Sequence, residues 1–126
     1  PRPLLMSAET TLYGILAAAP SVTALVGSGA AARIYPDAMP EDCAYPALVY
    51  VRAGTDPIVT IDGLKHGEFA TLSVQAWANT RGDADAVADA VELALLAAGE
   101  IPADRQAAYD PEMGLFAASL AVTLFV

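Results

Sequence analysis

The sequence predicts an α+β fold, in which a mostly antiparallel β-sheet is flanked by two main α-helices. Apolar residues recur at helical spacing in two segments, about residues 8–19 and 84–98. Residues 68–78 and 114–126 instead alternate between two sets of side chains, as strands do when one sheet face is buried. Strands joined by short connections favour antiparallel pairing, and helices packed on such a sheet complete the α+β arrangement.

The length predicts a single domain that spans residues 1–126, because 126 residues suffice to bury one core. Hydrophobic residues make up 56% of the chain, but most of the excess is alanine. No apolar run approaches the roughly 20 residues that a membrane-spanning helix needs. The longest run, 115–126, is interrupted by Ser119 and Thr123 and suits a strand. With no signal sequence before residue 1, we expect a soluble, unexported chain without a membrane partner.

Both helices have recognisable start and stop signals. Ser7 can cap the first helix, and Pro20 ends it. A short helical turn over 22–26 follows and stops at Gly27. The second main helix ends at Gly99. Its apolar stripe consists of Ala84, Val87, Val91, Ala94, Leu95 and Ala98.

Two short runs set an apolar strand against a proline. Because proline has no N–H for a sheet ladder, it is confined to strand ends, edges and bulges. Pro36 therefore ends a strand at about 32–35, and Pro46 precedes a strand at 47–52. The prolines bracket a loop over 37–45, and a further strand is expected at 105–109.

The segment at about 53–67 is predicted to be a long flexible loop. Gly54-Thr55-Asp56-Pro57 and 62–67 are rich in turn-forming residues, and a short β-favouring run separates them. The pattern is compatible with either a protruding hairpin or a mobile loop.

Charge and cysteine content exclude several classes of function. The chain has 15 acidic and 6 basic residues and a formal net charge of −9, which disfavours direct binding to nucleic-acid phosphates. Cys43 is the only cysteine, which rules out an intramolecular disulfide and a multi-cysteine zinc site. We expect Cys43 to fill space in a loop or in the core.

No combination of residues indicates an active site. His66 is the only histidine and has no G-x-S-x-G elbow to serve, so we interpret it as a loop or interface residue. Asp83, Asp85 and Asp89 lack the remaining ligands of a calcium loop and are explained by the helix dipole. The run 27–29 lacks the lysine of a phosphate loop and reads as a helix exit. The sequence therefore predicts no catalytic residue, no cofactor and no metal.

Several motifs together resemble the tail-completion family of tailed phages. They are Leu12-Tyr13-Gly14-Ile15-Leu16, Pro20-Ser21-Val22-Thr23-Ala24-Leu25-Val26-Gly27, Arg33-Ile34-Tyr35-Pro36 and Tyr45-Pro46-Ala47-Leu48-Val49-Tyr50. A long strand ending in Gln75-Ala76-Trp77-Ala78, an acidic alanine-rich helix and a C-terminal strand complete the resemblance. Members of the family are tail-terminator or head-to-tail joining proteins of a phage or of a phage-like gene transfer agent.

The resemblance implies a structural virion protein at the head–tail interface, assembled in the bacterial host cytoplasm. It implies a homo-oligomeric ring, typically a hexamer, which caps the head-proximal end of the tail tube, ends tube polymerisation and joins the tail to the head connector. The implied partners are the tail-tube protein and the connector, and DNA would pass through the lumen without specific binding.

We expect the ring or partner interface to include residues of the 53–67 segment and two strand aromatics, because exposed aromatics commonly anchor interfaces. The candidates are Asp56, Ile58, Asp62, Leu64, Lys65, His66, Phe69 and Trp77.

Two other functions remain open at this point. One is a small acidic protein-binding subunit of a bacterial complex unrelated to virions. The other is an enzyme that uses aspartate and tyrosine side chains in a cleft, which would need convergent carboxylates with shifted pKa values.

Overall fold

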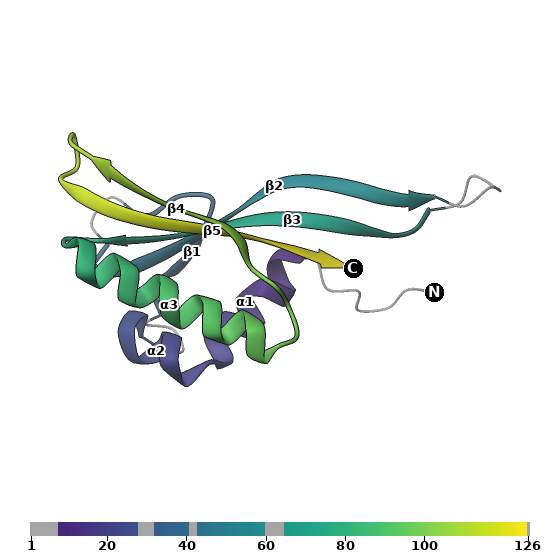
Figure 1. The fold of residues 1–126 in the computed structure, drawn as a ribbon, viewed down its shortest axis with the longest axis horizontal. Coiled ribbons are helices and arrows are strands. Elements are labelled where there is room, and N and C mark those ends of the chain that lie inside the picture. Colours follow the sequence, from purple (N-terminus) through teal and green to yellow (C-terminus); the bar gives the residue numbers. More distant parts are fainter. Residues whose placement is uncertain (1–7, 28–31, 41–42, 60–64, 126) are drawn as a thin grey trace.

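The computed structural model describes residues 8–27, 32–40, 43–59 and 65–125. Five strands form a single sheet, and three helices form a layer against it (Figure 1). In chain order the elements are α1 (Ala8–Ala18), α2 (Pro20–Val26), β1 (Ile34–Pro36), β2 (Ala47–Val59), β3 (Lys65–Ala78), α3 (Arg81–Ala97), β4 (Ala103–Asp110) and β5 (Leu115–Phe125). The α+β class predicted from the sequence is confirmed.

The sheet has the strand order β1-β2-β3-β5-β4 and is antiparallel except at one edge. There, β1 runs parallel to β2, with Ile34 opposite Leu48. The expectation of antiparallel pairing between neighbouring strands is therefore wrong for this pair. The connection between them starts at Asp37, whose N–H bonds to the Tyr50 carbonyl, and returns to the start of β2, so both strands point the same way.

All three helices cover the same face of the sheet (Figure 1). The core lies between this face and the helices, and its largest side chains are fully buried. They include Leu12 and Leu16 of α1, Leu48 and Leu72 of the sheet, and Leu95 of α3. In β3 the alternation predicted from the sequence is confirmed, because Ala70, Leu72, Val74 and Ala76 all face this core.

The first helical unit is bent by 85° between α1 and α2. Ala19 adopts an extended conformation, and Pro20 occupies the first turn of α2, where its missing N–H would have no helical partner. Within the described residues no single helix is long and apolar enough to cross a membrane; the bent pair α1–α2 passes that test only by combined length and composition.

Local signals set both ends of α3. The Thr80 hydroxyl oxygen accepts a hydrogen bond from the Asp83 N–H at 3.1 Å, which caps the first turn. At the other end Gly99 has a φ of +85°, a conformation that glycine adopts without strain. The Glu100 N–H then bonds to the Leu95 carbonyl at 2.9 Å and closes the helix.

The segment predicted to be a loop at about 53–67 is largely a protruding hairpin. β2 continues to Val59, β3 begins at Lys65, and the two remain paired to their tips. A register shift between Arg52 and Gly54 absorbs one residue, so the turn-forming residues do not end the strand. Pro57 is tolerated because, among the described residues, this part of β2 pairs with a strand on one side only. The hairpin extends beyond the helical layer (Figure 1).

The C-terminal strand is not a sheet edge. β5 lies between β3 and β4. β4 and β5 form a hairpin closed by the pair Asp110 and Leu115, and Gly114 in its turn has a φ of +68°.

Candidate functional site

Six of the eight predicted interface residues lie in the described part of the chain. Asp62 and Leu64 lie outside the described residues. Asp56, Ile58, Lys65 and His66 belong to the β2–β3 hairpin, where only the backbone is described, so His66 lies in a strand rather than in a loop.

The two aromatics of this set lie at opposite ends of β3. Phe69 sits opposite Asp56 at the base of the hairpin, and 45% of its surface is exposed. Trp77 lies eight residues further along, about 26 Å away in an extended strand. The predicted residues therefore do not form one site.

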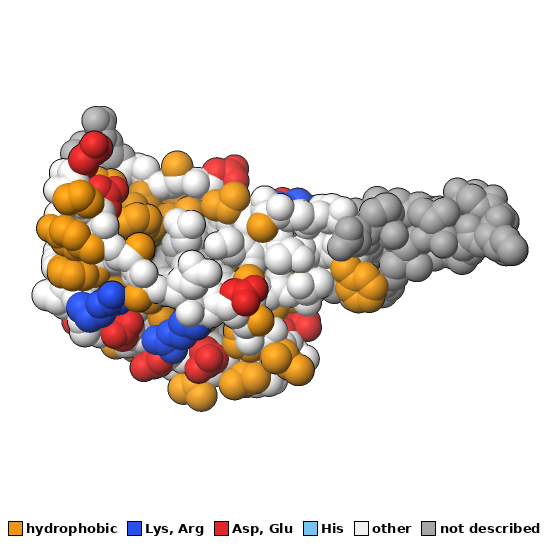
Figure 2. Space-filling view, turned by 45° about the horizontal axis from the view of Figure 1, so that its top comes forward, with side chains coloured by type: hydrophobic (Ala, Val, Ile, Leu, Met, Phe, Trp, Pro, Cys, Tyr) orange, Lys and Arg blue, Asp and Glu red, His pale blue; other side chains and the backbone are white. Residues whose placement is uncertain are grey.

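The sheet face away from the helices is uncharged in its centre. Thr71 and Thr123 share a hydrogen bond of 3.1 Å between their hydroxyl oxygens on this face. None of its central described side chains is charged: Val51, Thr71, Ser73, Gln75, Trp77, Ala117, Ser119, Ala121 and Thr123. Figure 2 brings this side forward and shows charged residues along both its upper and its lower border.

The loop between β1 and β2 covers one end of this face. It leaves a recess of about 400 Å³, lined in part by Met39, Tyr45 and Trp77. The Trp77 indole N–H donates to the Gln75 side-chain oxygen at 3.2 Å, and Val49 on the same face is only 3% exposed. We did not predict that this loop covers the sheet. Its apolar residues, such as Met39 and Tyr45, were the signal in the sequence.

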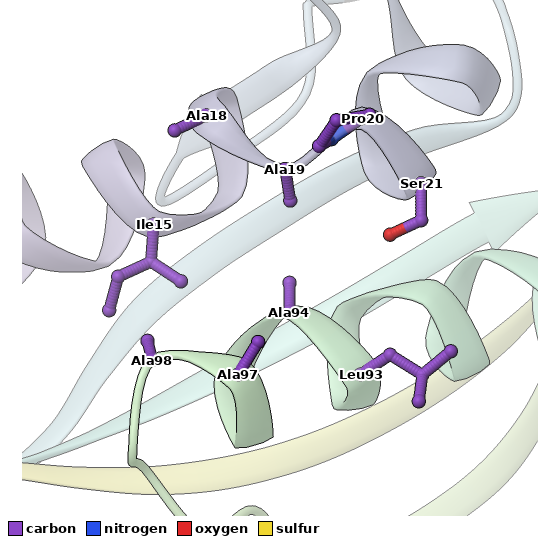
Figure 3. A pocket seen from close by; sticks show the side chains of 9 residues that line it. All are labelled: Ile15, Ala18, Ala19, Pro20, Ser21, Leu93, Ala94, Ala97 and Ala98. Carbon is purple, nitrogen blue, oxygen red and sulfur yellow. The ribbon is translucent and has the colours of Figure 1, made fainter.

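A second hollow, of about 610 Å³, lies between the α1–α2 corner and the C-terminal half of α3. In Figure 3, Ile15 and Ala19 point across it toward Ala94 and Ala98. Ser21 is the only residue in its lining with a polar side chain. Leu93 at its border is 62% exposed. The groove exists because the residues that face each other across it are mostly alanines, which do not fill the space between the helices. We did not predict this groove.

Three of the four acidic residues of α3 gather around one cation. Arg105 of β4 reaches across to α3, where one guanidinium nitrogen lies 2.6 Å from a carboxylate oxygen of Asp89. Asp85 and Glu92 are 3.9 Å and 4.0 Å away. The hydrogen bond to Asp89 and the surrounding carboxylates raise the pKa of Arg105. The helix dipole therefore explains only in part why acidic residues occur at these positions of α3. They also form ion pairs that hold the edge strand β4 against α3.

A second ion pair joins α1 to the base of the hairpin. Arg52 donates two hydrogen bonds to the Glu9 carboxylate, at 2.6 Å and 3.2 Å. This interaction lowers the pKa of Glu9 below its ordinary value of 4.5. A carboxyl group whose pKa is depressed in the folded state stabilises the fold above its unfolded pKa, and the contribution is lost as the pH falls through the folded value.

We therefore expect Glu9→Gln to destabilise the protein at pH 7 and to have a progressively smaller effect as the pH falls below 4.5. Urea unfolding at several pH values measures this. In an Arg52→Gln background the same Glu9 substitution should show no such pH dependence. A Glu9→Gln effect that stayed constant from pH 7 to 3 would contradict the assignment.

Nothing in the described part of the chain has the arrangement of a metal site, since no three His, Cys, Asp or Glu side chains converge there to hold an ion.

Comparison with known proteins identifies the family. Residues 10–126 match the model of the family described as tail completion protein gp17. The chain belongs to this family. It is a tail completion protein, and the family is structural rather than enzymatic.

A solved structure agrees with the fold of this tail completion protein. The match is to a chain in "Virion of native gene transfer agent (GTA) particle", with a TM-score of 0.69 and 20% sequence identity. It covers 91% of this chain and 90% of the other. A search of curated proteins finds no match.

Proposed function

We propose that this tail completion protein caps the head-proximal end of a tail tube as an oligomeric ring, typically a hexamer, ends tube polymerisation and joins the tail to the head connector. The family match over residues 10–126 carries the proposal. The similarity of fold to a chain of a gene transfer agent virion supports it and makes such a particle or a phage the expected setting.

Two surfaces of the protein are suited to contact with other proteins of the particle. The hairpin projects beyond the helical layer, and the groove beside α3 exposes apolar side chains (Figures 1 and 3). Exposed apolar surface of this kind is typical of interaction sites. We assign the hairpin, including Asp56, Ile58, Lys65 and His66, to the ring or partner interface, and keep Phe69 at its base as part of that interface.

DNA would pass through the ring without specific binding. Three of the described arginines are engaged by the protein's own oxygens: Arg33 by backbone carbonyls, Arg52 by Glu9, and Arg105 by Asp89. The guanidinium of Arg81 lies 6.0 Å from the Phe116 ring. With a net charge of −9 on each copy, we infer that a phosphate backbone would be repelled rather than held.

Deleting the gene tests the function. We expect overlong tails, or tails unattached to filled heads, in electron micrographs of the particles. A plasmid copy should restore normal particles, whereas the same plasmid with an early stop codon should not. Normal virions after deletion would refute the role.

A further inference from the structure

We propose that neighbouring copies in the ring are joined by strand pairing, in which the outer edge of β4 of one copy pairs with residues 53–59 of β2 of the next. This inference rests on the ring proposed above and names the elements that hold it together. It makes the sheet continuous from copy to copy.

The structure leaves two sheet edges open. Among the described strands, β4 ends the strand order on one side and pairs only with β5. On the other side, β1 pairs with only three of the 13 residues of β2. Within the described ranges, residues 53–59 therefore have β3 as their only strand neighbour. An open edge presents unpaired N–H and C=O groups, for which another strand is the natural partner.

The two edges differ from each other and lie on opposite sides of the sheet. Pairing the β4 edge of one copy with the β2 edge of the next is therefore a head-to-tail contact, which each copy can make twice. Repetition of such a contact closes a ring when the rotation between copies permits it. Pairing β4 with β4 would instead be a two-fold contact and would stop at a dimer.

The chemistry of both edges permits close approach. β4 is eight residues long and contains no proline or lysine, which are common devices for blocking an edge. Its register is regular from Gln106 to Asp110, and its side chains on the helix-free face include Gln106 and Ala108. On the same face β2 presents Gly54, opposite Thr71. The residues that would meet on this face, Gln106 and Ala108 of β4 and Gly54 of β2, carry no charge, and Pro57 further along β2 withholds only one N–H from that edge.

The strand register allows a test that distinguishes copies from one another. Ala108 is level with Ala117, Trp77 and Ala47 across the sheet. Gly54 of the same copy is therefore three strands away and seven residues further along. Because the register shift absorbs one of these seven residues, the two positions lie about 14 Å apart across the sheet and about 20 Å apart along it. A short link between them must join two copies.

The experiment uses cysteine pairs in a Cys43→Ser background. Gly54→Cys is combined with Ala108→Cys or with Gln106→Cys, since a Cβ at Gly54 meets open space and both β4 residues are exposed. The protein is mixed with tail-tube protein, treated with a short bismaleimide and separated under denaturing conditions. We expect a ladder from dimer up to hexamer. In the control, Gly54→Cys is combined with Ala86→Cys, an exposed position on α3, and should give no ladder.

The outcomes separate this inference from the ring itself. A ring detected by light scattering that gives no ladder with either pair would overturn the strand pairing and leave the ring intact. If the single variant Ala108→Cys gives linked dimers and neither double variant gives a ladder, β4 contacts β4 of another copy. This result would also overturn the proposed pairing of β4 with β2. Protein that stays monomeric with tube present would overturn both the ring and the pairing.

Discussion

Leu72→Ala should lower the free energy of unfolding by about 3 kcal/mol, because deletion of buried methyl groups loses their transfer energy and leaves a cavity. Leu72 is 0% exposed and lies in β3, with Arg52 of β2 opposite it on one side and Val122 of β5 on the other. A strand bonded on both sides cannot easily shift to refill the space. Urea unfolding, at a concentration where light scattering shows monomers, measures the loss.

The neighbouring residue provides a matched control. Thr71 points to the helix-free face and bonds to Thr123, so Thr71→Ala should cost no more than about 1 kcal/mol. Equal losses for the two substitutions would contradict the assignment of the core to the helical side.

Arg33→Met should cost about 2–3 kcal/mol, because charge-assisted hydrogen bonds to two carbonyls are lost. The Arg33 Nε donates to the Pro46 carbonyl at 2.8 Å, and its Nη2 donates to the Leu25 carbonyl at 2.9 Å. One side chain thus fastens the end of α2 to the start of β2. Thermal and urea unfolding of the variant measure the effect.

Arg33→Lys separates geometry from charge. A single ammonium group cannot reproduce the fork of donors, so lysine should recover less than half of the loss. Full recovery by lysine would show that charge alone matters at this position and would contradict the two-carbonyl bridge.

The sequence predicted the elements whose signals are local. Pro20 ends α1, Gly99 follows α3, and the alternation in β3 correctly separates core side chains from the opposite face. Each of these signals acts on its own backbone or on the face of its own element. Boundaries therefore came within a few residues.

Signals that depend on a distant partner were harder to interpret. Gly54 and Pro57 favour turns locally, but pairing with β3 overrides this preference and a register shift absorbs the extra residue. The parallel direction of β1 depends on the path of the following loop, which has no periodic pattern. Local propensity yields to tertiary pairing in both cases.

The candidate surfaces were predicted less completely than the fold. Phe69 and Trp77 were predicted to be exposed aromatics, but only Phe69 is; Trp77 is half-buried beside the loop between β1 and β2. The separation of the two residues along β3 follows only from the strand register. The groove beside α3 depends on Ala94 and Ala98 facing Ile15 across a helix bend. Alanines in a sequence do not reveal whether they are covered or face a hollow.

The strand order has a consequence for folding kinetics. β2–β3 and β4–β5 are hairpins between neighbours in sequence, whereas β3 and β5 meet only after the chain has passed through α3 and β4. Pairing Phe69 with Phe125 closes a long loop, and such non-local contacts slow folding. Each hairpin can form early, but the sheet is complete only when β3 and β5 join. β3 lies between β2 and β5, so its amide hydrogens should be among the last to exchange with solvent.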